Sequence, residues 1–171
     1  DREKVFAYTI NKMYKRQFLL DCGVRAVHVK LIEDILFNID VFGYVQRVCL
    51  IPESFYHYMK YTTQTLTSVY IPEYFDIINM HYKKMKALYE KNNMYTGDIR
   101  SGCANVHLKH VATVFERSCS KESGKSFKDR VNEAKEVLSH PYTQEATQYC
   151  KAVTKQEKLI NKVICSKNAT L

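Results

Sequence analysis

The sequence predicts one all-helical domain over residues 1–171, stapled by disulfide bonds and built from about seven helices. The chain has 171 residues, which is enough for one domain with a substantial core. Glycine and proline are scarce, with 5 and 3 residues, whereas a sandwich of many short strands needs more turn residues. Six cysteines, an even number, could form disulfide bonds among Cys22, Cys49, Cys103, Cys119, Cys150 and Cys165.

Composition narrows the class of protein further. Hydrophobic residues make up 46% and charged residues 26% of the chain, which argues against intrinsic disorder. No apolar run approaches the roughly 18 to 20 residues that a membrane-spanning helix needs. The net charge of +8 indicates an anionic partner, such as a heparin-like polyanion, an acidic lipid or a small anion. A basic surface without a specific partner is the plainer alternative.

Three features favour a secreted, extracellular protein. The six cysteines include no C-x-x-C pair, which argues against zinc ribbons and thioredoxin-like sites and leaves disulfides as the expected use. The sequence opens at Asp1 without methionine, as a mature protein does after signal cleavage, and Asn168 begins a glycosylation sequon. Six buried thiols in a cytosolic protein are the alternative. Secretion makes nucleic acid the least expected partner, and we expect a monomer.

The first residues predict a basic amphipathic helix. Between residues 3 and 20 the apolar side chains recur near helical spacing, and Lys12, Lys15 and Arg16 fall outside this stripe. Such a helix could lie on a membrane surface. Core packing is the plainer expectation, because the rest of the chain supplies apolar faces to meet it.

The segment from residue 19 to residue 49 allows two assignments. Apolar residues from Val24 to Leu36 follow a helical stripe. Many of them are β-branched, which lowers helix propensity and makes a short strand the competing prediction. We expect Gly43 to end or kink this segment, and residues 42–50 to form a short apolar element.

The next part of the chain is rich in tyrosine. Pro52 breaks the chain, and Glu53 is expected in a first helical turn. Residues 55–70 carry a dense tyrosine group, namely Tyr56, Tyr58, Tyr61 and Tyr70. Because tyrosine combines an apolar ring with a polar hydroxyl, this group suits an amphipathic ligand. Ordinary packing is the plainer alternative in a chain with 13 tyrosines.

Pro72 stands at a position suited to a helix start, and apolar spacing predicts a helix over residues 73–91. Residues 92–101 are expected to form a loop. Near the end of the chain, Pro141 suits a first helical turn, and residues 142–165 are predicted to form one last helix. Its lysines either bind a polyanion or form a solvated face.

The stretch from residue 102 to residue 136 organises the predicted fold. It reads as an amphipathic helix with Cys103 and Cys119 near its ends, then a Ser/Gly turn and a second helix. The two cysteines are separated by fifteen residues, about four helical turns, so both can face one core. Ser126 is expected to cap the second helix, with Asp129 three residues later. We expect this hairpin to wall a small-molecule pocket.

Motifs for catalysis or metal binding are weak. Cys103, His107 and His110 share one helical face and could bind zinc, but only if Cys103 stays reduced. The G-K-S run at residues 124–126 lacks the upstream glycine of a phosphate loop, because Cys119 stands there. No G-x-S-x-G elbow or cysteine-protease signature is present. We therefore expect a non-enzymatic protein without a metal or cofactor.

The stretch VFERSCSKESGKSFKDR, residues 114–130, resembles the D7 salivary proteins of blood-feeding flies, which belong to the odorant-binding superfamily. Two shorter stretches, Cys22-Gly-Val-Arg25 and Asn38-Ile-Asp40, and the terminal Cys165 add to the resemblance. Together they cover roughly a third of the chain. The family's cysteine after Ile-Asp is Val41 here, the C-x-x-x-C pair is missing, and residues 50–102 have no counterpart.

The resemblance implies a helical carrier with an internal pocket. In amine-binding members, acidic residues after the Ser/Gly turn hold the ligand's ammonium, and the corresponding positions here are Asn132 and Lys135. A lysine repels an ammonium, so an eicosanoid, a fatty acid or another amphipathic ligand is expected instead of a biogenic amine. The expected ligand-binding residues are Arg25 and Lys135 for a carboxylate, Phe115, Phe127 and Val131 for an apolar tail, and His28, Tyr58 and Asn132 around them.

The predicted role is sequestration of a small host mediator. The alternative is a helical protein–protein module, such as a cytokine-like factor or an inhibitor of a host haemostatic or immune protein, acting through the basic surface. A closed apolar cavity of about 300 Å³ or more would favour the carrier. A solid core with an exposed apolar patch would favour the protein-binding module.

Overall fold

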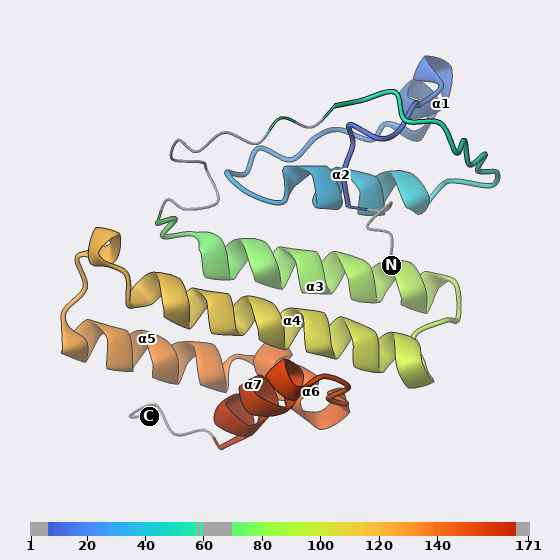
Figure 1. Ribbon diagram of the computed structural model, residues 1–171. Helices are drawn as coiled ribbons and strands as arrows, with labels where there is room; N and C mark the ends of the chain where they lie inside the picture. Colours follow the sequence, from blue (N-terminus) through green and yellow to red (C-terminus); the bar gives the residue numbers. More distant parts are fainter. Residues whose placement is uncertain (1–6, 58, 60–69, 167–171) are drawn as a thin grey trace. The chain divides into compact units, whose positions relative to one another are not determined.

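The computed structural model describes residues 7–57, 59 and 70–166. It divides the chain into two compact units, unit 1 (residues 1–68) and unit 2 (residues 69–171). The described residues form seven α-helices and one short 3₁₀ turn, with no strand (Figure 1). The all-α fold class and the number of helices are therefore confirmed.

Unit 1 holds two helices, α1 (Arg16–Cys22) and α2 (Glu33–Phe42). The segment before α1 is not helical; it is hydrogen-bonded to α2. The Tyr14 hydroxyl donates to Asn38 Oδ1 at 2.5 Å, and the Asn38 amide donates to the Ala7 carbonyl at 3.2 Å. Asn38 is fully buried, so these bonds satisfy an amide that water cannot reach. The Thr9 hydroxyl adds a bond to Asp34 Oδ1 at 2.6 Å.

Several predictions for unit 1 are wrong. The described part of residues 3–20 is helical only from Arg16, because the preceding segment is held by the side chains of α2. The chain between α1 and α2 is neither helix nor strand. It leaves α1 at Gly23, with φ of 65°, and enters α2 at Ile32, also in the left-handed region with φ of 55°. Gly43 does end α2, as predicted.

The residues after α2 also differ from the prediction. No regular element forms between residues 44 and 57, so neither the apolar element at 42–50 nor the helical turn after Pro52 is present. Tyr58, Tyr61 and the threonine-rich run 62–68 lie outside the described residues. The tyrosine group is therefore described only in part.

Unit 2 contains the remaining helices, α3 (Tyr74–Lys91), α4 (Gly97–Ser118), α5 (Phe127–Ser139), α6 (Pro141–Tyr149) and α7 (Lys155–Cys165), with a 3₁₀ turn, η1 (Lys121–Ser123), between α4 and α5. Helix α4 packs against each of the other four helices. Figure 1 shows α3 on one side of α4 and α5, α6 and α7 on the other. Leu108 and Val111 of α4 are fully buried and form the centre of this packing.

Local signals in unit 2 predicted its helices well. The helical hairpin is confirmed as α4, η1 and α5. Ser126 and Asp129 form a capping box at the start of α5, in which each side chain accepts the other residue's backbone N–H. Pro141 occupies the first turn of α6, where its missing N–H has no helical partner to lose.

Two boundaries were predicted wrongly. Helix α4 begins at Gly97, inside the expected loop of residues 92–101. The expected last helix over residues 142–165 is broken between α6 and α7. Two sets of contacts stabilise the non-helical segment between α6 and α7. Thr154 and Glu157 form a capping box that starts α7, and the side chain of Asn105 binds the backbone of Lys151.

We expect the substitution Thr154→Ala to lower the free energy of unfolding by about 1 kcal/mol, because the N–H of Glu157 loses its capping oxygen. Amide exchange in the first turn of α7 should accelerate with it. Lys155→Ala, an exposed change one residue later, is the control and should alter neither quantity. Equal exchange rates in Thr154→Ala and the unchanged protein would contradict this assignment of the cap.

Candidate functional site

A small pocket lies along α1 in unit 1. Its volume is about 220 Å³, it is partly open to solvent, and its lining consists of Arg16, Leu19, Leu20, Gly23, Val24 and Arg25. The helical spacing of α1 places Arg16, Leu19 and Leu20 on one side of the helix. Gly23 then ends the helix in a left-handed conformation, so Val24 and Arg25 turn back toward it.

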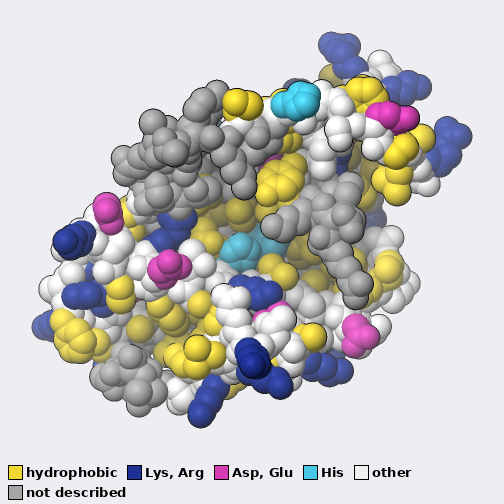
Figure 2. Space-filling view, in the orientation of Figure 1, with side chains coloured by type: hydrophobic (Ala, Val, Ile, Leu, Met, Phe, Trp, Pro, Cys, Tyr) yellow, Lys and Arg dark blue, Asp and Glu magenta, His cyan; other side chains and the backbone are white. Residues whose placement is uncertain are grey.

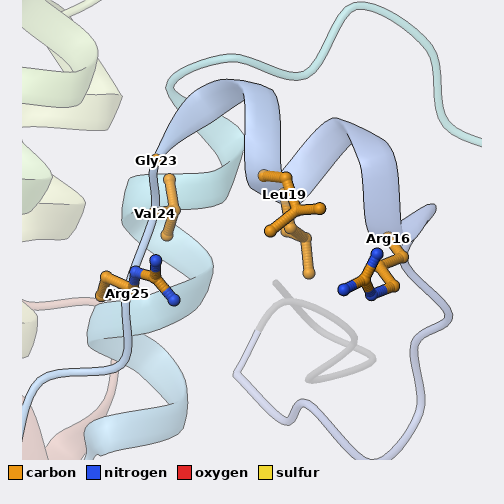
Figure 3. A pocket seen from close by; sticks show the side chains of 6 residues that line it. Arg16, Leu19, Gly23, Val24 and Arg25 are labelled. Atoms are coloured by element: carbon orange, nitrogen blue, oxygen red, sulfur yellow. The ribbon is translucent and has the colours of Figure 1, made fainter.

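The pocket combines an apolar floor with two cationic groups. In Figure 3 the side chains of Arg16 and Arg25 extend from opposite sides toward the space beside Leu19. Neither arginine forms a salt bridge with another described residue, and both are exposed. No described carboxylate occupies either guanidinium group, and an anionic group of a ligand could bind both, with Leu19 and Val24 facing its apolar part.

The predicted ligand-binding residues are distributed over both units. Arg25 and His28 belong to unit 1, and Arg25 lines the pocket while His28 is exposed. In unit 2, Phe115 and Val131 are half-buried, whereas Phe127, Asn132 and Lys135 are exposed on α5. Tyr58 lies outside the described residues. Three of the predicted ligand-binding residues of unit 2 thus lie at the surface of the helical hairpin. A ligand pocket walled by this hairpin remains a prediction.

The basic residues do not gather into one region on the face shown in Figure 2, where lysines and arginines are scattered among other side chains. The lysine stripe predicted on the last helix is now divided by the break before α7. Its members are all exposed: Lys151, Lys155, Lys158 and Lys162. This arrangement fits a solvated face at least as well as a polyanion site.

Unit 2 contains a group of buried and partly buried rings that we call the imidazole–tyrosine cluster: His81, His107, His110, His140, Tyr74, Tyr82 and Tyr142. The ring centroids of Tyr82 and His107 lie 4.6 Å apart, and those of His81 and His110 lie 5.5 Å apart. The Tyr74 hydroxyl lies 2.9 Å from His110 Nδ1. His107 is only 1% exposed, and neither of its ring nitrogens has a hydrogen-bond partner among the described residues.

Burial lowers the pKa of three of these imidazoles, those of His81, His107 and His110. Loss of water, reinforced by the neighbouring histidines, lowers the pKa of His107 to about 3. Burial and the nearby His110 lower the pKa of His81 to about 4. Burial also lowers the pKa of His110. The lowered pKa values of His81, His107 and His110 therefore favour their uncharged form at neutral pH.

All six cysteines carry free thiols in this structure. Cys103 is buried against Tyr82 and Tyr95, and burial raises the pKa of its thiol to about 11. Cys103 thus packs as a small apolar side chain. Within the described part of the chain, no group of three or more histidine, cysteine, aspartate or glutamate side chains could hold a metal ion.

Sequence reasoning identified only Arg25 among the residues that line the pocket. Arg16 was assigned to the outer face of a longer helix, so its approach to Arg25 across Gly23 was not anticipated. The imidazole–tyrosine cluster was also missed. Its members are spread from residue 74 to residue 142, and only the packing of both α3 and α6 against α4 brings them together.

Comparisons of the chain with protein-family models, curated protein sequences and solved structures find no match. Within its described residues, no helix is both long and apolar enough to cross a membrane.

Proposed function

We propose that this protein is a secreted, non-enzymatic carrier, like the odorant-binding proteins it resembles, and that it sequesters a small anionic amphipathic ligand. The observation that supports the proposal is the α1 pocket, where Arg16 and Arg25 flank an apolar floor. A fatty acid or eicosanoid has the matching chemistry, with a carboxylate for the guanidinium groups and an apolar chain for Leu19 and Val24. Two arginines would repel the ammonium of a biogenic amine.

The pocket also limits how the ligand is held. Its volume of about 220 Å³ is below the roughly 300 Å³ expected of a carrier cavity, and it is partly open, so it does not meet the criterion of a closed apolar cavity. A short chain would be accommodated, whereas a long one would extend beyond the pocket. We also propose that the protein is a monomer, that its cysteines form disulfide bonds and that it is related to the D7 proteins.

Calorimetry with octanoate, after native mass spectrometry of the purified protein, tests the carrier. Arg16→Ala and Arg25→Ala should each weaken binding by roughly tenfold or more, because each removes a hydrogen bond to a charged group. Lys15→Ala removes the same charge beside the pocket and should leave affinity unchanged. Lys135→Ala tests whether the carboxylate of the ligand binds at Lys135 on α5 instead, in which case this variant would weaken binding. Unchanged affinity in both arginine variants would exclude the α1 pocket as the site.

A specific observation also supports the second candidate, a protein–protein interaction module. Large apolar side chains after α2 are between 51% and 78% exposed, namely Tyr44, Val48, Leu50, Ile51, Phe55, Tyr56 and Met59. Exposed apolar residues at this density are typical of contact surfaces. This segment would supply the apolar part of an interface, and the scattered lysines and arginines its polar rim.

The two functions can be separated in one set of variants. Surface plasmon resonance against heparin and a panel of host plasma proteins would reveal a macromolecular partner. Leu50→Asp combined with Phe55→Asp should abolish capture of a protein partner and leave octanoate binding unchanged. If Arg25→Ala loses octanoate binding but still captures the same macromolecular partners as the unchanged protein, the result would support the carrier.

A further inference from the structure

We infer that residues 8–25 of unit 1, which we call the docking segment, bind the surface of a membrane rich in acidic lipids. Core packing is the plainer expectation for this part of the chain, yet four of its large apolar side chains are exposed to solvent. The exposed fraction is 86% for Met13 and between 41% and 46% for Tyr8, Ile10 and Leu20. Apolar side chains exposed beside basic ones are typical of proteins that bind at a bilayer surface.

Hydrogen bonds to α2 explain why these apolar side chains face solvent. The Thr9 hydroxyl donates to Asp34 Oδ1 at 2.6 Å, and the Tyr14 hydroxyl donates to an amide oxygen of the same helix at 2.5 Å. Because the polar groups of Thr9 and Tyr14 are held toward α2, Ile10 and Met13 between them are left on the outer side. The exposure of the apolar side chains therefore follows from how the segment is anchored.

The docking segment also concentrates positive charge. Its basic residues are Lys12, Lys15, Arg16 and Arg25, and its one acidic residue is Asp21. The resulting net charge of +3 is more than a third of the chain's +8, in about a tenth of its length. Lys15, Arg16 and Arg25 are exposed and form no salt bridge with another described residue. Lipid phosphate and carboxylate groups supply the complementary charge.

A second exposed apolar segment of unit 1 does not match such a membrane. The described residues between 44 and 59 also expose large apolar side chains, but the charges in this stretch are Arg47 and Glu53, which cancel. In the docking segment, by contrast, apolar and basic side chains coincide. Figure 2 shows basic and hydrophobic side chains beside one another in the region where Figure 1 places α1. Charge complementarity therefore assigns the acidic lipid surface to residues 8–25.

The contact is peripheral, and it goes beyond the carrier proposed above. Helix α1 has only seven residues, so Met13 and Leu20 would reach no deeper than the boundary between headgroups and acyl chains. Met13 and Lys15 lie outside the lining of the α1 pocket. Docking on a membrane and binding of octanoate can therefore be lost separately.

Sedimentation of the full chain with vesicles tests the inference. At low salt the protein should bind vesicles of equal parts phosphatidylcholine and phosphatidylserine, and it should not bind phosphatidylcholine alone. Met13→Asp should weaken this binding by about tenfold or more, because it replaces an inserted apolar side chain by a negative charge. Lys15→Ala should weaken it roughly fivefold, because one cation is lost. Raising NaCl to about 1 M should release the protein, since salt screens the attraction.

Each substitution has a matched control elsewhere in the chain. Phe55→Asp makes a similar change in the second exposed segment, and Lys155→Ala removes an exposed lysine of α7. Both controls should bind the phosphatidylserine vesicles as the unchanged protein does. Because Met13 and Lys15 are exposed, their variants should unfold at the same urea concentration as the unchanged protein, so that weaker binding reports on the surface itself.

Three outcomes would overturn the inference: equal binding to the two kinds of vesicle, unchanged binding in Met13→Asp, or capture on heparin without binding to either vesicle. Calorimetry with octanoate separates these outcomes from the carrier, because Met13→Asp and Lys15→Ala should bind octanoate as the unchanged protein does. If octanoate binds and the phosphatidylserine vesicles do not, membrane docking is excluded and the carrier stands. If the vesicles bind and octanoate does not, the carrier is excluded and membrane docking stands.

Discussion

Lowering the pH from 7 to 4.5 should remove about 5 kcal/mol from the free energy of unfolding, through His81 and His107 of the imidazole–tyrosine cluster. In the unfolded chain a histidine has a pKa near 6.5. In the folded protein the pKa of His81 is about 4 and that of His107 about 3. A loss of this size is comparable to the whole stability of many domains.

The sign follows from which state binds protons. Below about pH 6.5 the unfolded chain takes up a proton on each histidine, whereas the folded protein keeps both rings neutral. Stability is therefore complete above pH 6.5 and falls by about 1.4 kcal/mol per pH unit for each histidine as the pH drops. The loss ends for each ring only when the pH passes its folded-state pKa. His110, whose pKa is also lowered, contributes in the same direction.

Urea unfolding at pH 7 and pH 4.5 measures this dependence. His107→Leu should remove about half of it, because the buried ring no longer titrates and the apolar replacement needs no hydrogen bond. His28→Leu makes the same change at an exposed histidine and should preserve the full dependence. Equal urea midpoints of the unchanged protein at the two pH values would show that these rings are not buried as described.

The second large effect is expected at the centre of α4. Leu108→Ala should lower the free energy of unfolding by about 3 kcal/mol, because it removes buried methyl groups and leaves a cavity. Leu108 is completely inaccessible, and α4 packs against every other helix of unit 2, so the neighbours cannot easily collapse onto the smaller side chain. Thermal or urea unfolding at neutral pH would measure the loss.

Leu159→Ala is the matched control. This leucine of α7 is 64% exposed, so the same truncation should change stability by less than about 0.5 kcal/mol. If Leu159→Ala were as destabilising as Leu108→Ala, the assignment of α4 to the centre of the core would be wrong.

The features that were predicted correctly depend on residues close together in sequence. The capping box of Ser126 with Asp129, Pro141 in a first turn and Gly43 at a helix end are signals within one helical turn. The errors involve distant partners. Tyr14 leaves the expected helix because Asn38 of α2 accepts its hydroxyl, and the last helix is interrupted where Asn105 binds Lys151. Local propensity does not report such contacts.

The candidate site was predictable to a smaller extent. Arg25 was selected for a carboxylate, and it lines the pocket. Arg16 could not be paired with it without knowing that Gly23 reverses the chain, and nothing in the local pattern places Leu19 between the two. Neutral imidazoles in a core are equally hard to foresee, because histidine is compatible with both surface and interior.

The central position of α4 has a consequence for how the protein folds. Because α3, α5, α6 and α7 all pack on this one helix, each of them can bury its full apolar face only after α4 has formed. Substitutions in α4 should therefore slow folding, whereas those in a peripheral helix such as α7 should mainly speed unfolding.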